Sequence, residues 1–83
     1  MKIAVRYFAS VREALGPGEE VGVDTGASIA SLRDALAARG GRHAEALGRD
    51  RVLRSARNRV LSAEDTRLED GDEVGFFPPV TGG

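Results

Sequence analysis

The residues of this chain best suited to do chemistry are the last two, Gly82 and Gly83. A glycine carboxylate has no neighbouring Cβ to shield it, and two glycines in a row form a thin segment that can enter a narrow cleft. Pro78 and Pro79 favour an extended path, so we expect this segment to project from the folded body. The sequence therefore predicts a terminal carboxylate that is handled inside another protein's active site.

A frayed end without function is the alternative, because the last residues of most domains are poorly ordered. The pair Phe76-Phe77 directly before the prolines is an unusual composition for a solvated tail. We therefore favour a folded domain of residues 1–77 and an extended, functional tail of residues 78–83. Besides the two glycines, four tail residues are expected to contact a partner: Pro78, Pro79, Val80 and Thr81.

No second site of chemistry is expected in the rest of the chain. There are no cysteines, which excludes disulfides, a thiolate nucleophile and a cysteine-based metal site. His43 is the only histidine and has no second ligand at a suitable spacing, so we expect it to be solvated and predict no metal site. Ser28 and Ser31 have no nearby base, and Gly16-Pro17-Gly18 matches no phosphate-binding pattern. Activation of the terminal carboxylate must then come from a partner.

Length and composition indicate one small domain that can fold alone. The 83 residues are 41% hydrophobic and carry 12 basic and 13 acidic side chains, a net charge of −1. This balance argues against nucleic-acid binding. No apolar run approaches the roughly 18–20 residues of a membrane span, and the first residues read as a strand and not as a signal peptide. We expect a cytoplasmic protein that binds neither nucleic acid nor membrane.

One local run of arginines departs from this balance: Arg49, Arg51, Arg54, Arg57 and Arg59. It can be a solvated strand face, or a patch complementary to an acidic partner. Aromatic residues are not interleaved with it, which argues against stacked bases.

The hydrophobic pattern predicts the elements that position the tail. Residues 2–8 and 73–77 alternate as strands, and residues 21–23 form a second strand antiparallel to the first. Ser10 to Glu13 has capping-box spacing for one short helical turn, and Ser28 is the expected N-cap of the main helix, which Gly40-Gly41 ends. A further short turn is expected within residues 42–48, and strand signals follow at 52–53 and 60–61, with Asn58 at the turn between them.

This order of elements fits an α+β fold in which one main helix covers a mixed sheet of about five strands. It is the order of the β-grasp, or ubiquitin-like, roll. If Ile3, Val5, Val74 and Phe76 face the helix, alternation places Phe8 and Phe77 on the uncovered face, as anchors for a partner. The alternative is a bulge that turns both rings into the core. Alternation alone does not decide whether Val60 or Leu61 joins them.

Two segments carry a family resemblance: Leu68-Glu69-Asp70-Gly71-Asp72-Glu73-Val74, and Phe76-Phe77-Pro78-Pro79-Val80-Thr81-Gly82-Gly83. Together with Tyr7-Phe8-Ala9-Ser10-Val11-Arg12-Glu13, they closely resemble the small, sulfur-carrying subunit of molybdopterin synthase (MoaD type) in the ThiS/MoaD ubiquitin-like family. The resemblance favours Leu61 as the third anchor. The chain departs from the family pattern at Arg57, where an apolar residue is usual, and at Ser62, where a β-branched residue is common.

The resemblance implies a carrier that binds no cofactor and has no active site of its own. An adenylyltransferase would use ATP to adenylate Gly83, and sulfur from a donor protein would replace AMP to leave a thiocarboxylate. Two such carriers would supply the dithiolene sulfurs when the large subunit makes molybdopterin from precursor Z, in a heterotetramer of two small and two large subunits. The alternatives are a carrier for thiamine or tRNA thiolation, a ubiquitin-like modifier, and an interaction domain without terminal chemistry.

Overall fold

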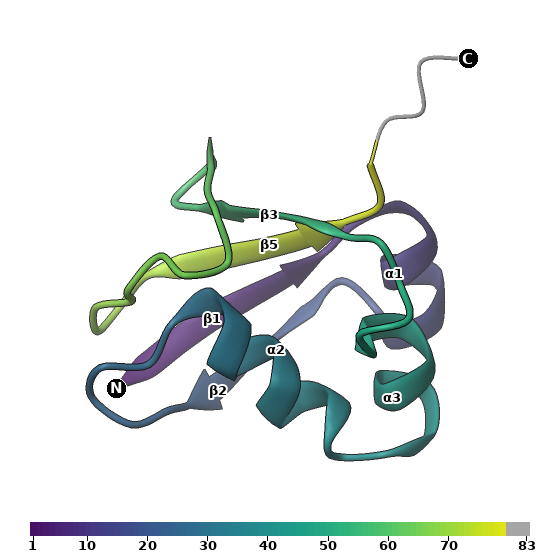
Figure 1. Cartoon of the computed structure of the whole chain (residues 1–83), viewed down its shortest axis with the longest axis horizontal. Helices are drawn as coiled ribbons and strands as arrows, with labels where there is room; N and C mark the ends of the chain where they lie inside the picture. The colour runs from purple at the N-terminus through teal and green to yellow at the C-terminus, as the bar shows by residue number, and fades with distance from the viewer. Residues whose placement is uncertain (80–83) are drawn as a thin grey trace.

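Helix α2 (Ile29–Ala37) packs across one face of a five-stranded sheet in the computed structural model, which describes residues 1–79 (Figure 1). The sheet has the order β2-β1-β5-β3-β4. Strands β1 and β5 are parallel at its centre, and the other pairs are antiparallel. The predicted α+β, β-grasp fold with a mixed sheet is confirmed. The strands are β1 (Lys2–Tyr7), β2 (Gly18–Gly22), β3 (Arg54–Arg57), β4 (Val60–Leu61) and β5 (Glu73–Phe77).

The core lies between α2 and the sheet, and it follows from alternation in the two central strands. Val5 is opposite Val74 and Tyr7 is opposite Phe76 in the parallel register, and all four side chains are buried. They pack with the apolar stripe of α2, which is formed by Ile29, Leu32 and Leu36. The intervening residues of β1 are exposed on the opposite face, which no helix within residues 1–79 covers (Figure 1). We call this the open face of the sheet.

The main helix begins and ends where the sequence predicts. The Ser28 hydroxyl accepts a hydrogen bond from the Ser31 amide at 3.1 Å, and the Ser31 hydroxyl accepts one from the Ser28 amide at 2.9 Å. This capping box has serine at the position where glutamate or glutamine is usual. After α2, Gly40 adopts φ +77°, a left-handed conformation that glycine accommodates without strain. Helix α3 (Gly41–Leu47) follows and contains the short turn expected in residues 42–48.

Several boundaries differ from the predictions. Strand β2, expected at residues 21–23, runs from Gly18 to Gly22. Helix α1 (Ala9–Leu15) is longer than one turn, and Ser10 lies inside it and caps nothing. Its N-cap is Phe8, which continues the extended path of β1, so the helix begins directly after the strand. The prediction of a strand at residues 52–53 is wrong, because β3 starts at Arg54, where pairing with β5 begins.

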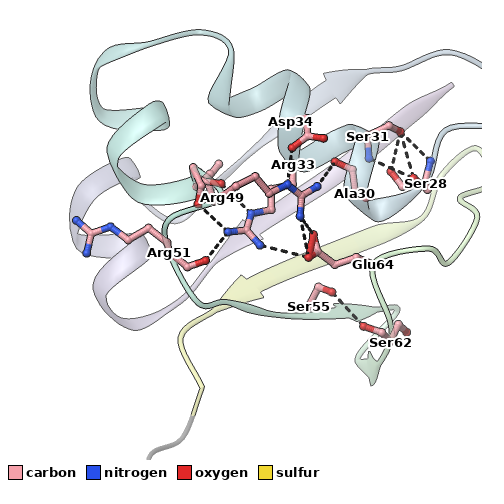
Figure 2. Close-up of polar contacts among 12 residues, drawn as sticks. Ser28, Ala30, Ser31, Arg33, Asp34, Arg49, Arg51, Ser55, Ser62 and Glu64 are labelled. Carbon is pink, nitrogen blue, oxygen red and sulfur yellow. Dashed lines mark hydrogen bonds and ion pairs between the residues drawn. The ribbon is translucent and has the colours of Figure 1, made fainter.

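A buried arginine explains why residues 48–53 form a loop and not a strand. Arg33 on α2 has only 3% of its surface exposed. Its guanidinium donates to the carbonyl oxygens of Leu47 at 2.7 Å, Gly48 at 2.8 Å and Arg51 at 2.7 Å (Figure 2). These bonds hold the loop against the helix, and hydrogen bonds to a charged donor are among the stronger ones. The role of Arg33 could not be read from the sequence, because an arginine beside an apolar stripe is typical of a solvent-facing position.

The β3–β4 hairpin is tied to the start of β5 by a second polar cluster. Asn58 and Arg59 have positive φ angles, as a two-residue hairpin turn of type I′ requires. The predicted turn at Asn58 is therefore confirmed. Asp72 accepts hydrogen bonds from Arg57 Nε at 2.6 Å and Asn58 Nδ2 at 3.0 Å. The departure at Arg57 is thus matched by a buried acid, and it does not prevent the pairing of β3 with β4.

Acid should weaken the fold through Asp72. The Arg57 guanidinium, together with hydrogen bonds from the Glu69 amide and Asn58, lowers the pKa of Asp72 to about 2. Since the folded pKa is below the ordinary value, this stabilisation is present above about pH 4 and is lost as the pH falls through about 2, and it amounts to about 2 kcal/mol. We expect Asp72→Asn to be less stable than the parent at pH 7, with a smaller further loss between pH 5 and 2.

Urea unfolding followed by circular dichroism at several pH values measures this difference. Asp65→Asn, at an exposed acid, is the matched control and should follow the parent curve. A variant Asp72→Asn that loses as much stability in acid as the parent would contradict this role of Asp72.

Candidate functional site

Phe8, Leu61 and Phe77 come together on the open face of the sheet, around a hollow of about 500 Å³. The Phe8 and Phe77 rings meet edge to face, with centroids 6.5 Å apart and planes at 81°. Phe8 is 43% exposed and Leu61 is 64% exposed. We call this feature the sheet hollow; its lining residues are Phe8, Ala56, Arg59, Leu61, Glu73, Gly75 and Phe77. Exposed aromatic and aliphatic side chains around a concave surface are typical of protein docking sites.

Strand geometry brings these side chains together. Phe8 follows buried Tyr7 and its amide donates to the Phe76 carbonyl at 3.2 Å, so its ring lies over β5 on the open face. A Cβ on Gly75 would lie only 2.9 Å from Phe8 Cε2, so glycine at this position lets the ring lie close to the strand. Phe77 follows buried Phe76 and therefore also points to the open face. The predicted directions of both rings are confirmed, and neither ring belongs to the core.

The register of the hairpin decides between Val60 and Leu61. Ala56 pairs with Leu61, and Ala56 lines the sheet hollow, so Leu61 lies on the same face. Val60 pairs with Arg57 on the other face. Leu61, which only the family resemblance favoured, is the residue that joins the two phenylalanines. That these three side chains bind a partner stays a prediction.

The base of the tail adjoins the sheet hollow. Phe77 is the last residue of β5, and Pro78 lines a separate cavity of about 380 Å³ together with residues of α1 and the 48–53 loop. Pro79 is half-buried. Val80, Thr81, Gly82 and Gly83 lie outside the described residues, so the division between domain and tail stays a prediction. The sheet hollow therefore reaches the last residue before the proline pair.

A cluster of ionisable side chains on the helix side of the sheet corrects the expectation for His43. The Tyr7 hydroxyl donates to Glu19 at 2.7 Å, Arg39 pairs with the same carboxylate, and His43 Nε2 lies 2.9 Å from Glu19 Oε2. Burial alone would raise the pKa of Glu19, but hydrogen bonds from His43, Arg39 and Tyr7 outweigh it and lower the pKa to about 2. His43 is thus half-buried and paired, and the cluster joins β1 and β2 to the helices.

This cluster includes a single histidine and a single carboxylate, too few ligands for a typical metal site. Within residues 1–79, no group of three or more histidine, cysteine or acidic side chains is arranged to hold a metal ion. In the same range, no helix has the length and apolar character needed to cross a bilayer.

Comparison with known proteins places the chain in a family. Residues 5–83 match the model of the ThiS family. The chain belongs to this family. This ThiS-family chain is 48% identical over 82 residues to the molybdopterin synthase sulfur carrier subunit of Escherichia coli K12, covering 98% of this chain and 99% of the relative. It is 35% identical over 92 residues to small archaeal modifier protein 3 of Haloferax volcanii, with both chains fully covered.

A solved structure gives a third comparison. The chain is similar to a structure described as a protein–protein complex of subunits 1 and 2 of molybdopterin-converting factor from Helicobacter pylori 26695. The TM-score is 0.69 at 30% identity, and both chains are covered completely. The ThiS-family chain is thus similar to these proteins over its whole length, and not only in an isolated motif.

Truncating the two neighbouring phenylalanines should separate the core from the surface. We expect Phe76→Ala to reduce the free energy of unfolding by about 3–5 kcal/mol, because the ring is fully buried. Phe77→Ala should reduce it by only about 1 kcal/mol, since the ring loses mainly its edge-to-face contact with Phe8. Chemical denaturation of both variants measures the difference. Equal losses would mean that Phe77 is a core residue.

Proposed function

We propose that this ThiS-family chain is the sulfur-carrier subunit of a molybdopterin synthase and that Gly83 carries the sulfur as a thiocarboxylate. The observation that carries the proposal is the sheet hollow, an exposed apolar surface that directly adjoins the base of the Gly-Gly tail. The likeness to the Escherichia coli carrier over nearly the whole chain supports it, as does a family match that extends through residue 83. In this proposal, the folded domain binds the partner, and the tail carries the reactive group.

The chemistry of the carboxylate sets the order of steps. A carboxylate oxygen is a poor leaving group, so an adenylyltransferase must first join AMP from ATP to the Gly83 carboxylate, releasing pyrophosphate. The terminal sulfur of a persulfide on a donor protein then attacks the carbonyl carbon, and the bond to AMP breaks. A thiol reduces the remaining S–S bond and leaves the thiocarboxylate. Ionised sulfur is a better nucleophile than oxygen, for the reason that thiolate is the reactive form of cysteine.

Sulfur transfer takes place in the large subunit. Two carriers supply the two sulfurs of the dithiolene as precursor Z becomes molybdopterin, in a heterotetramer of two small and two large subunits. The groups that catalyse this step belong to the large subunit, and ATP binds to the adenylyltransferase. The complex of subunits 1 and 2 from Helicobacter pylori supports a large-subunit partner that docks on this fold. We assign Phe8, Leu61 and Phe77 to that contact, with Pro78, Pro79, Val80 and Thr81 leading the terminus inward.

Protein modification is the second candidate, because the chain is also similar over its full length to small archaeal modifier protein 3. A modifier uses the same activated terminus but forms an amide bond to a lysine of its target, without sulfur at the terminus. The two functions therefore differ in the product formed from the activated chain, which is a thiocarboxylate in one case and a protein conjugate in the other. A thiocarboxylate adds the mass difference between sulfur and oxygen, whereas a conjugate adds the mass of a second protein.

Intact-mass spectrometry of purified mixtures tests the order of activation. The chain alone should neither hydrolyse ATP nor take up sulfide, since this chemistry is assigned to partners. With the adenylyltransferase of the same organism and ATP, an acyl-adenylate should form at Gly83, and a persulfide donor with a thiol should convert it to the thiocarboxylate. Sulfur that appears without ATP, or at any residue other than Gly83, would refute the mechanism.

Removal of Gly83, or its extension by one alanine, should abolish conversion of precursor Z and leave the fold intact. Both changes lie beyond the strands, so the unfolding midpoint should match that of the parent. Full conversion of precursor Z by the shortened chain would refute the carrier assignment.

Phe77→Ala should instead weaken binding to the large subunit by about 30-fold or more, the loss expected for an interface anchor of ~2 kcal/mol. Calorimetric titration with the large subunit measures that affinity.

A further inference from the structure

Guanidinium groups surround the apolar sheet hollow. Arg6 pairs in register with Gly75, and Arg54 pairs with Phe77, so both lie beside residues that line the hollow. Arg6 and Arg54 are exposed, and each alternates with a buried neighbour, which places them on the open face. Arg59 in the hairpin turn lines the hollow itself. We call Arg6, Arg54 and Arg59 the cationic rim.

The other arginines of the run are engaged within the fold. Arg49 pairs with Asp34 at 2.8 Å and with Glu64 at 2.7 Å (Figure 2). Arg51 donates to the Glu45 carbonyl at 2.8 Å. Arg57 is held by Asp72. The structure thus divides the five arginines into three that stabilise the fold and two, Arg54 and Arg59, that remain on the open face.

The rim carries more positive charge than its surroundings neutralise. Glu73 is the acid at the hollow, and it lies 3.9 Å from Arg6 and 3.6 Å from Arg59. Within residues 1–79, no ion pair involves Arg54. Three guanidinium groups against one carboxylate leave a local net charge of +2, on a chain whose overall charge is −1. The positive charge is therefore concentrated at the sheet hollow.

We propose that the cationic rim selects and orients a large-subunit surface in which acidic side chains surround an apolar patch. This inference rests on the proposed function, in which the sheet hollow docks on the large subunit. Apolar groups at the centre of an interface supply most of the binding energy, and charges at the rim mainly raise the rate of association and reject partners of the same sign. An acidic surface meets the rim with attraction, and a basic one is repelled.

The test compares charge reversals that change the net charge equally. Arg54→Glu alters the rim, and Arg42→Glu alters an exposed arginine of α3 on the helix side. Association and dissociation rates with the large subunit of the same organism are measured by surface plasmon resonance at 25 and 500 mM NaCl. At low salt, we expect Arg54→Glu to lower the association rate constant by about tenfold, because steering depends on local charge. At high salt, screening should reduce the difference to less than about threefold.

Two further variants and the control decide the outcome. The association rate constant of Arg54→Gln should fall between those of the parent and Arg54→Glu, and the double variant Arg54→Glu/Arg59→Glu should associate more slowly than Arg54→Glu alone. Arg42→Glu should stay within about twofold of the parent, and an equal loss in that variant would show that only net charge matters and would overturn the proposal. Circular dichroism confirms that each variant is folded.

Phe77→Ala separates failure of this inference from failure of the proposed function. If Phe77→Ala weakens binding while Arg54→Glu associates like the parent at low salt, docking at the sheet hollow stands and the cationic rim has no role. If Phe77→Ala binds the large subunit like the parent, docking at the hollow is wrong, and the rim proposal falls with it.

Discussion

The parallel pairing of β1 with β5 is the constraint on which the rest of this structure depends. It places Val5 against Val74 and Tyr7 against Phe76 on the helix side, where all four are buried. Because side chains alternate across a strand, the same pairing places Phe8 and Phe77 next to each other on the open face. The core and the sheet hollow thus lie on opposite faces of the same pair of strands. Of two residues adjacent in sequence, one packs in the core and the other lines the hollow.

Two polar clusters position the segments that flank the central strands. Arg33 holds the 48–53 loop against α2 through three carbonyl oxygens, so β3 enters the sheet at Arg54. Asp72 joins Arg57 and Asn58 to the loop before β5, and the hairpin that it holds carries Leu61. Each cluster buries a charge that is matched by hydrogen bonds, and these bonds hold the adjoining loop or hairpin in one geometry. Together they fix where the third anchor of the sheet hollow lies.

Recognition and reaction are assigned to different parts of the chain. The folded domain presents the apolar hollow and the cationic rim, and the proposed reaction occurs on a terminal glycine inside other proteins. In the proposed function, an activating enzyme and a synthase both act on the same terminus of the carrier. In that proposal, the sheet hollow at the base of the tail lets the large subunit direct the glycines into its own site.

Local patterns in the sequence determined the central strands, the Ser28 cap, the turn at Asn58 and the opposite directions of Phe76 and Phe77, because alternation and capping act over a few residues. Only the tertiary structure decided what depends on distant partners. Leu61 rather than Val60 reaches the hollow through the β3–β4 register, His43 meets Glu19 across 24 residues, and β3 starts late because Arg33 holds the preceding loop. Tertiary contacts also decide the roles of the arginine run. Arg49 and Arg57 pair with acids on other elements, whereas Arg54 lies on the open face.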